Sequence, residues 1–565
     1  MNLGCNYWSS NAGLRIWEDF DESVIDDDFR LIAEHGMNMI RIFPMWHVFM
    51  PVKAVYGPDQ QVIYYENTII KEEFLVMFKT VLTLARKHNL KVIVPLITGW
   101  MSGRLFLPEA FNNVNLITDR TAIRYQVSFI KQFIERFKDD DIIVAWGLGN
   151  ECNVMGEVAD SNESWHWMYT MTSAIRQSDS TRPIYSDMHG MTIDGNWKLF
   201  DQKETVDVMT THPYPVFTPY CDLDKLINLR GALHAIAESA YYRDLTGKPC
   251  IIEEVGSLGP MILSEELEVK YLRTLLFECL NENIDTVLWW CAFDQDKLDF
   301  PPYSFSGLER NLGLFRSNKQ PKPTAEYLKE FRTFIDQYQF ESLPSQKDGV
   351  LLLSYDQNHW QVAYGGYILA SQADLKITYS HVEDELPDSN LYLLPCASGH
   401  HVIKKVKWDQ LINRVKEGAT LYISYEDGFI SDFKEVTGYD LKFRNDLIKS
   451  DDHTLYHNKL GKGNVYFTKQ PIEKMTLENS EFIPNTIYRD LKMKNEVMTV
   501  SDPLIKVNVK KISETESLAI LINYHEQEKK PDFTMNDEYE IVKVLYGELN
   551  LIKDNDALIM HIRKK

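Results

Sequence analysis

The stretch DIIVAWGLGNECN, residues 141–153, starts as an apolar run and ends with the polar pair Asn150 and Glu151. A continuous apolar run is typical of a strand that is buried on both faces in a parallel sheet. Its polar end has two interpretations. Asn150 would cap a helix with Glu151 in the first turn, or the pair forms a catalytic site where the strand ends. Taken alone, the helix cap is the better interpretation, so the rest of the chain must decide.

Seven further apolar runs of the same kind precede residue 294. They are NLGCNYW (2–8), MNMIRIF (37–43), KVIVPLI (91–97), RPIYSDM (182–188), VDVMTTH (206–212), KPCIIEE (248–254) and DTVLWWCAF (285–293). Helical patterns separate the runs at 70–88, 121–138, 162–178, 222–246, 263–283 and 322–338. Eight strand–helix units within residues 1–340 predict an α/β fold, the (β/α)8 TIM barrel. A doubly wound open sheet would need a glycine-rich phosphate turn after an early strand, and the sequence has none.

The helical pattern at 121–138 indicates how these segments pack. The apolar residues Ile123, Val127, Ile130, Ile134 and Phe137 recur at helical spacing. They form a single stripe, which predicts that one face of this helix lies on the sheet.

The chain after residue 340 predicts two further domains. A polar segment at 336–348 lacks periodicity and is interpreted as a linker. Strand-like runs at 349–355, 391–397 and 419–425, with a helical pattern at 403–417, predict a smaller α/β domain over 349–465. The runs LIKVNVKKI, SLAILINY, EIVKVLYG and ALIMHIRKK lack helices between them. They predict a small C-terminal β-sandwich over 466–565.

Composition excludes several partners. The chain has 60 Lys and Arg against 82 Asp and Glu, a net charge of −22, which disfavours nucleic acid. Its seven cysteines are odd in number and contain no C-x-x-C, so neither a disulfide framework nor structural zinc is expected. Because no signal peptide pattern and no run of about 18 apolar residues occurs, we expect a cytoplasmic protein without a membrane partner.

Polar and aromatic side chains end most of the predicted barrel strands. They are Arg41, Asn150, Glu151, His212 with Tyr214, Glu253, Glu254, Trp289 and Trp290. In a TIM barrel the active site lies at these carboxyl ends. Each residue alone has a plainer interpretation: a rim ion pair for Arg41, a core histidine, a solvated acidic pair, and core packing for at least one tryptophan. Their recurrence at the same end of several strands favours a catalytic site.

Two carboxylates on different strands suit the cleavage of glycosidic bonds. One protonates the leaving oxygen, and the other stabilises or traps the sugar cation. Different surroundings hold one protonated and the other ionised. An amide beside the acid, such as Asn150, can hydrogen-bond the sugar's 2-hydroxyl. No H-x-x-x-H or comparable cluster occurs at the strand ends, so no metal and no other cofactor is expected.

These residues resemble the clan A retaining glycoside hydrolases. WGLGNE is similar to their acid/base strand, and PCIIEEVG to their nucleophile strand in a register that selects Glu254 over Glu253. MNMIRIF, THPYP and LWW resemble their second, sixth and eighth strands. The stretches RIWEDFD, LITGWMSG, DMHGMT and WWCAFDQDKLDFPPY resemble a β-mannosidase-like branch of glycoside hydrolase family 5. The order of barrel, amidotransferase-like α/β domain and β-domain resembles family 42 β-galactosidases, whose middle domain builds a trimer.

The resemblance implies a retaining double displacement. Glu254 would be the nucleophile and Glu151 the acid/base. Arg41 and Tyr214 would hold the nucleophile ionised, Asn150 would bind the 2-hydroxyl, and Trp290, or alternatively Trp289, would form the floor under the sugar. The further candidates for substrate binding are His212, His189, Trp46, Trp100, Asp294 and Glu309.

The expected function is therefore a retaining exo-β-glycosidase that removes terminal β-linked sugars, first of all β-mannosides, from short oligosaccharides. The alternatives are a β-galactosidase, an endo-β-mannanase or glucanase of the same clan, and a non-catalytic carbohydrate-binding protein. A homotrimer is expected by analogy alone. Cys396, with His400 and His401 nearby, could alternatively form a Cys–His nucleophile pair. No acidic partner is evident for it, and Cys396 is interpreted as structural.

Overall fold

The computed structural model describes residues 1–338, 343, 347–398, 401–427, 433–439, 454–479, 487–491 and 497–565. The chain forms two compact units. The first contains Met1–Tyr214, Thr246–Val269 and Ile284–Phe340, and the second contains Pro215–Leu245, Lys270–Asn283 and Glu341–Lys565. In the part of the chain that the structure describes, no helix combines the length and apolar character needed to cross a bilayer.

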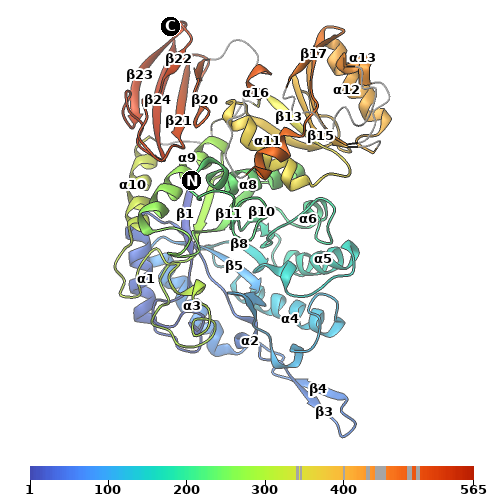
Figure 1. The fold of residues 1–565 in the computed structure, drawn as a ribbon. Helices are drawn as coiled ribbons and strands as arrows, with labels where there is room; N and C mark the ends of the chain where they lie inside the picture. Colours follow the sequence, from blue (N-terminus) through green and yellow to red (C-terminus); the bar gives the residue numbers. More distant parts are fainter. Residues whose placement is uncertain are drawn as a thin grey trace. The chain divides into compact units, whose positions relative to one another are not determined.

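The first unit contains an eight-stranded parallel sheet in the order β10-β11-β12-β1-β2-β5-β8-β9 (Figure 1). The strands are β1 (Asn2–Asn6), β2 (Met39–Arg41), β5 (Lys91–Ile97), β8 (Ile143–Gly149), β9 (Ile184–Tyr185), β10 (Met209–Thr211), β11 (Cys250–Val255) and β12 (Thr286–Trp289). A parallel bridge between Tyr185 and Val208 joins the two ends of the sheet. The predicted TIM barrel and all eight of its strands are confirmed.

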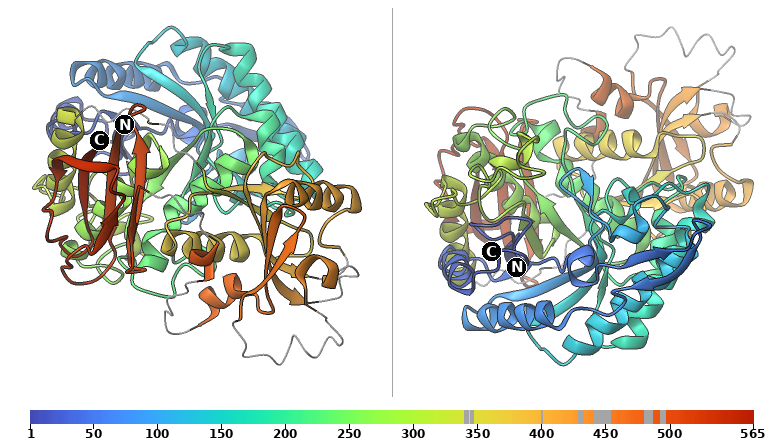
Figure 2. Two further views of the ribbon diagram at one scale, coloured as in Figure 1. Left: turned by 90° about the horizontal axis from the view of Figure 1, so that it is seen from above. Right: turned by 90° about the horizontal axis from the view of Figure 1, so that it is seen from below.

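Helices follow the barrel strands, and those of the first half are α1 (Glu22–Glu34), α3 (Glu72–Lys87), α4 (Arg120–Phe137), α5 (Ser161–Ser178) and α6 (Leu199–Thr205). The later ones are α8 (His234–Thr246), α9 (Glu265–Glu282) and α10 (Pro323–Tyr338). All of them fall within or near the six predicted helical segments except α1 and α6, which were not predicted. In Figure 2 the blue to teal helices of the first half lie outside the strands. This arrangement leaves the strand ends and the loops after them to form a site.

The buried face of α4 differs from the predicted stripe. Phe129 and Phe133 are fully buried there with Ile130 and Ile134, whereas Ile123 and Val127 are only half-buried. The larger phenylalanine rings take the centre of the face because they bury more apolar area.

The second unit contains a six-stranded sheet in the order β14-β13-β15-β16-β18-β17, in which only the β17–β18 pair is antiparallel. The strands are β13 (Gly349–Leu353), β14 (Ile377–His381), β15 (Leu391–Ser398), β16 (Thr420–Asp427), β17 (Tyr456–Leu460) and β18 (Gly463–Thr468). Its longest helices are α11 (His359–Gln372) and α12 (Lys405–Glu417). This is the predicted smaller α/β domain.

The C-terminal region has two antiparallel sheets. Four strands pair in the order β20 (Ile505–Lys511), β21 (Glu516–Asn523), β24 (Asp556–Lys564) and β23 (Tyr539–Tyr546), and β19 (Met498–Val500) pairs with β22 (Phe533–Met535). Met498 and Val500 share one hydrophobic core with Leu521 and Leu558 of the larger sheet. Two sheets around one core form the predicted β-sandwich.

Candidate active site

Arg41, the last residue of β2, lies at the centre of the polar strand ends and is fully buried. Its Nη1 donates to Glu254 Oε1 at 2.8 Å and to Asn150 Oδ1 at 3.0 Å, and its Nη2 donates to Gly149 O at 2.9 Å. A buried guanidinium needs such charged and polar partners. Arg41 therefore ties together the ends of β2, β8 and β11.

Asn150 and Glu151 follow β8 and do not cap a helix. Glu151 precedes a short 3-10 turn, Cys152–Val154, and makes no capping hydrogen bond. Instead, Asn150 Nδ2 donates to Trp100 O at 3.1 Å, and Trp100 Nε1 donates to Glu151 Oε2 at 3.1 Å. The backbone of Glu151 is left-handed, with φ of 45°, and such strain in a residue other than glycine is concentrated at functional sites. The helix-cap interpretation is wrong, and both side chains belong to the polar site.

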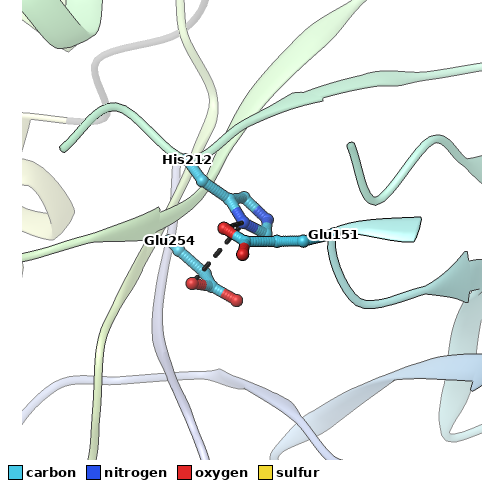
Figure 3. A group of neighbouring side chains, drawn as sticks. All are labelled: Glu151, His212 and Glu254. Atoms are coloured by element: carbon cyan, nitrogen blue, oxygen red, sulfur yellow. Dashed lines mark hydrogen bonds and ion pairs between the residues drawn. The ribbon is translucent and has the colours of Figure 1, made fainter. Parts of the chain in front are cut away.

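His212 lies between the two carboxylates of the site (Figure 3). Its Nδ1 is 3.0 Å from Glu151 Oε1 and 3.5 Å from Glu254 Oε2. Tyr214 donates its hydroxyl to Glu254 Oε2 at 3.3 Å. One oxygen of each glutamate and a ring nitrogen of His212 lie within 4.8 Å of one another. The structure thus brings together residues from β8, β10 and β11 that are more than 100 positions apart at the extremes.

The charges of this cluster are strongly coupled. Burial raises the pKa of Glu254 to about 7, although the charges of His212 and Arg41 oppose the shift. Burial also opposes ionisation of Glu151, but the hydrogen bond and charge of His212 outweigh it and lower the pKa to about 2. Burial disfavours the His212 cation, yet the surrounding carboxylates raise its pKa to about 10. At neutral pH one proton therefore resides on His212, in hydrogen-bond contact with Glu151.

A third carboxyl, Glu309, lies near the pair. Its Oε2 accepts a hydrogen bond from Ser102 Oγ at 3.1 Å, and the Trp290 side chain also donates to it. Burial raises the pKa of Glu309 to about 7, with contributions from the charges of Glu254 and Glu151. Trp290, rather than Trp289, is the tryptophan that reaches this group, since Trp289 Nε1 donates to the carbonyl of Leu312 at 3.2 Å.

The remaining sequence candidates differ in their surroundings. His189 is close enough that its charge lowers the pKa of Glu151. Trp46 is fully buried and stacks on Phe111 with ring centroids 5.3 Å apart. Asp294 accepts from Lys322 Nζ at 2.7 Å and is buried. The contacts of Trp46 and Asp294 are those of core packing and a buried ion pair. Cys396 is buried with Glu473 at 3.4 Å, and His400 lies outside the described residues.

Sequence reasoning missed two polar residues of the cluster, Asn6 and Asp187, and gave no role to a third, Glu253. Asn6 accepts from Arg41 Nη1 at 3.2 Å and donates to the carbonyl of Glu253 at 3.0 Å. Asp187 lies 3.3 Å from Arg41 Nη2. Glu253, considered only as a solvated strand end, is fully buried and lies 3.2 Å from His212 Nε2. Asn6 ends the first strand and Asp187 follows the fifth, so the rule that identified Arg41 would have found both.

Glu151, His212 and Glu254 also present donor atoms of the kinds that bind divalent cations, a grouping that the sequence spacing did not reveal. A histidine must be neutral to ligate a metal. His212 holds a proton up to a pKa of about 10, and Arg41 places a fixed positive charge 2.8 Å from Glu254. The charges therefore favour proton transfer and covalent chemistry over cation binding.

Comparison with known proteins gives consistent results. Residues 6–296 match the family model described as cellulase, glycosyl hydrolase family 5. A curated relative from Neosartorya fischeri, described as probable mannan endo-1,4-β-mannosidase F, is 24% identical over 266 residues, which cover 41% of this chain and 54% of the relative. The chain thus spans about half the length of the curated relatives that it matches.

Two solved structures resemble the chain over most of its length. The exo-β-1,4-mannosidase Op5Man5 from Opitutaceae bacterium strain TAV5 has a TM-score of 0.69 at 20% identity, covering 85% of this chain and 93% of that one. A β-galactosidase from Bacillus circulans sp. alkalophilus has a TM-score of 0.68 at 11% identity and covers 99% of this chain and 98% of that one. At such identities the likeness concerns the fold.

Proposed function

This chain belongs to glycosyl hydrolase family 5, and from that premise we propose that it is a retaining exo-β-glycosidase that releases terminal β-mannosyl groups from short oligosaccharides. The observation that carries the proposal is the approach of Glu151 and Glu254, whose nearest ligand oxygens lie within 4.8 Å of each other. Retaining enzymes hold their carboxyl groups about 5–5.5 Å apart, whereas inverting enzymes leave a wider gap for water.

In the proposed reaction Glu254 attacks the anomeric carbon while Glu151 protonates the departing oxygen. A glycosyl-enzyme ester forms, and Glu151, now a carboxylate, activates the water that hydrolyses it. Arg41 and Tyr214 both donate to Glu254 and so favour its ionised form. Asn150 is proposed to bind the 2-hydroxyl, and Trp290 to lie under the sugar ring.

The reaction requires a different distribution of protons from the resting site, and one proton transfer from His212 to Glu151 provides it. Glu151 must be protonated and Glu254 ionised. Because His212 Nδ1 is 3.0 Å from Glu151 Oε1, the His212 proton can move along that hydrogen bond and convert Glu151 into the acid. The imidazole of His212 is then neutral and no longer attracts Glu254. Arg41 becomes the cation that holds Glu254 in its ionised form.

The choice of β-mannosides is supported by the names of the curated relative and of the Opitutaceae structure. A β-galactoside is the second candidate, favoured by the full-length likeness to the Bacillus enzyme. Endo-acting mannanase or glucanase activity is a third. These sugars differ in single hydroxyl directions, so the preference depends on side chains that reach O2 or O4.

The test is hydrolysis of 4-nitrophenyl β-mannoside, β-galactoside, β-glucoside, β-xyloside and β-fucoside by the parent and by Glu254→Ala. We expect release of mannose by the parent alone, and partial rescue of the variant by azide with an inverted glycosyl azide as product. Glu73→Ala, which removes an exposed glutamate from α3, serves as the control and should behave as the parent. Full activity of Glu254→Ala would refute the nucleophile, and fast release of another sugar would replace mannose.

We further propose that the chain works as a homotrimer in the cytoplasm. The hairpin of β3 (Lys53–Tyr56) and β4 (Val62–Glu66) projects from the barrel and exposes Tyr56, Ile63 and Tyr64, each by more than half (Figure 1). Clustered apolar side chains on a protruding ribbon are characteristic of subunit contacts. All seven cysteines are buried thiols, which supports a reducing compartment.

A further inference from the structure

Asp187 is the buried carboxyl of the site to which no step of the proposed reaction gives a part. It is fully buried, and its backbone is left-handed, with φ of 49°. Its Oδ2 accepts a hydrogen bond from Gly149 N at 2.7 Å. A Cβ at Gly147 would lie 2.0 Å from the same oxygen, so any other residue at this position of β8 would displace the carboxyl of Asp187. The backbone of β8, which leads to the proposed acid Glu151, therefore packs directly against the carboxyl of Asp187.

The neighbour of Asp187 is a second buried carboxyl, Glu253, the residue before the proposed nucleophile. Both carboxyls contact the guanidinium of Arg41: Asp187 Oδ1 lies 3.3 Å from Nη2, and Glu253 Oε1 lies 3.4 Å from Nε. Glu253 Oε1 is nevertheless buried without a hydrogen-bond donor among the described residues. An ionised Asp187 could not supply that donor, because an ionised carboxylate has only acceptor atoms. A proton on one of the two carboxyls would supply it, as in other carboxyl pairs that share a site.

The surroundings decide which carboxyl carries the proton. Glu253 lies 3.4 Å from Arg41 Nε and 3.2 Å from His212 Nε2, two cationic groups that favour its ionised form. Burial and the charge of Glu253 raise the pKa of Asp187 well above its ordinary value. The charge of Arg41 opposes this shift, since its Nη2 lies 3.3 Å from Asp187. The same Nη2 also donates to Gly149 O, and the other guanidinium nitrogens contact Glu253 and Glu254. The positive charge of Arg41 is therefore shared among three carboxyls. The other titratable groups facing Asp187 are Tyr185 and Cys152, both neutral.

We propose that Asp187 is a positioning residue that acts as a neutral carboxylic acid and donates its proton to Glu253. The hydrogen bond from Asp187 fixes Glu253 between Arg41 and His212. Both cationic groups then keep their contacts with Glu254. A neutral Asp187 also spares the site a further negative charge beside three glutamates. The inference rests on the proposed function for its kinetic part, but the state of the carboxyl can be measured without turnover.

The Asp187→Asn variant tests whether Asp187 acts as a neutral carboxylic acid or as an ionised carboxylate. An amide has the size of a protonated carboxyl, can donate to Glu253 and can accept from Gly149 N. We expect kcat, KM and the pH profile of this variant to stay within about threefold of the parent. Asp187→Ala leaves Glu253 unpaired, and we expect kcat to fall by about a hundredfold with little change in KM. Asp179→Asn is the control, because Asp179 is an ionised buried aspartate bound to Arg182 at 2.7 Å, and its variant should lose thermal stability.

The direct measurement is the infrared difference spectrum of parent minus Asp187→Asn at about pH 9, where Glu254 and Glu309, with pKa values of about 7, are ionised. We expect the carbonyl stretching band of one protonated carboxyl in the parent, absent from the variant. A carboxylate band in its place, or a loss of kcat in Asp187→Asn as large as in Asp187→Ala, would overturn the proposal. If the parent has no glycosidase activity, the spectrum still decides the state of Asp187 and the failure belongs to the proposed function.

Discussion

His212 is the residue on which the protonation of the whole site depends. It contacts Glu151, Glu253 and Glu254, and its raised pKa of about 10 keeps one proton in the cluster at neutral pH. The raised pKa of Glu254, about 7, means that this carboxyl is neutral below that pH and ionised above it. In the proposed reaction only an ionised Glu254 can attack the sugar, and only a proton retained in the cluster can reach Glu151. The active form therefore exists between the two values.

We predict a bell-shaped pH profile of kcat/KM for the parent enzyme. The value should rise with pH through about 7 as Glu254 ionises and fall through about 10 as the proton shared by His212 and Glu151 is lost. The measurement uses 4-nitrophenyl β-mannoside, or the sugar that proves to be the substrate, from about pH 4 to about pH 11. The limits belong to the coupled cluster rather than to single groups.

Substrates with a better leaving group provide the control. A 2,4-dinitrophenyl glycoside releases 2,4-dinitrophenolate, which leaves without being protonated. The alkaline limb should therefore weaken while the acid limb stays, since the nucleophile is still needed. An acid limb that vanishes with this substrate would assign the lower pKa to another group.

Most of the site was predictable because it follows one rule. In a barrel of parallel strands the carboxyl ends converge, and Arg41, Asn150, Glu151, His212, Tyr214 and Glu254 end strands or follow them closely. Trp46 begins the short helix α2 (Trp46–Phe49) and Asp294 lies in a loop, and their burial against Phe111 and Lys322 depends on packing that one sequence does not encode locally. The proton shared by Asp187 and Glu253 was equally hidden, because it arises only where two distant segments meet.

At the scale of elements, three of the barrel helices start where an aspartate caps them. Asp21, Asp119 and Asp160 each accept backbone N–H groups from the first turns of α1, α4 and α5. These caps fix where the three helices start, and apolar strand patterns fix the sheet. The β3–β4 hairpin was not predicted, since most of its residues are exposed and the alternation that marks a half-buried strand is missing.

Asp119→Ala should destabilise the first unit through α4. Asp119 Oδ1 accepts from Thr121 N at 2.9 Å and Ala122 N at 2.8 Å, and loss of such a cap costs ~1 kcal/mol. Urea unfolding followed by circular dichroism measures the change. Asp119→Asn should retain most of the stability, and Asp139→Ala, an exposed aspartate beyond the end of α4, should have no effect. Equal losses in the cap variant and the Asp139 control would contradict the role of the cap.

At the scale of the molecule, the proposed trimer depends on the exposed apolar side chains of the β3–β4 hairpin. The triple variant Tyr56→Ser, Ile63→Ser, Tyr64→Ser removes the apolar side chains of the hairpin without touching the barrel core. We expect a trimer for the parent and a monomer for the variant in size-exclusion chromatography with light scattering. Val542→Ser, an exposed residue of β23, is the control and should remain trimeric. A monomeric parent would end the trimer proposal, and a trimeric triple variant would place the contact elsewhere.

Two helical segments of the barrel sequence belong to the second compact unit, which the division at residues 340, 349 and 465 did not foresee. That three-domain division remains a prediction. Within the unit, Arg230 Nη1 donates to Thr476 O at 3.0 Å, and Lys506 Nζ lies 2.7 Å from Glu278 of α9. The Tyr364 hydroxyl donates to the carbonyl of Arg230. Helix periodicity predicts that such segments have a buried face, but it does not say which part of the chain covers it.

A chain of residues 1–338 is therefore expected to fail as an independent domain. Removing 347–565 takes away the carbonyl group of Thr476 that accepts from Arg230 and the Lys506 side chain that pairs with Glu278. A buried carboxylate then loses its ion pair, and the apolar side chains of α8 and α9 around it are exposed to water. We expect aggregation and no glycosidase activity in purified 1–338, and recovery of both solubility and activity when 347–565 is co-expressed. A fragment 1–338 that stays monomeric, unfolds cooperatively and hydrolyses substrate as fast as the full chain would show that α8 and α9 need no cover from the C-terminal half.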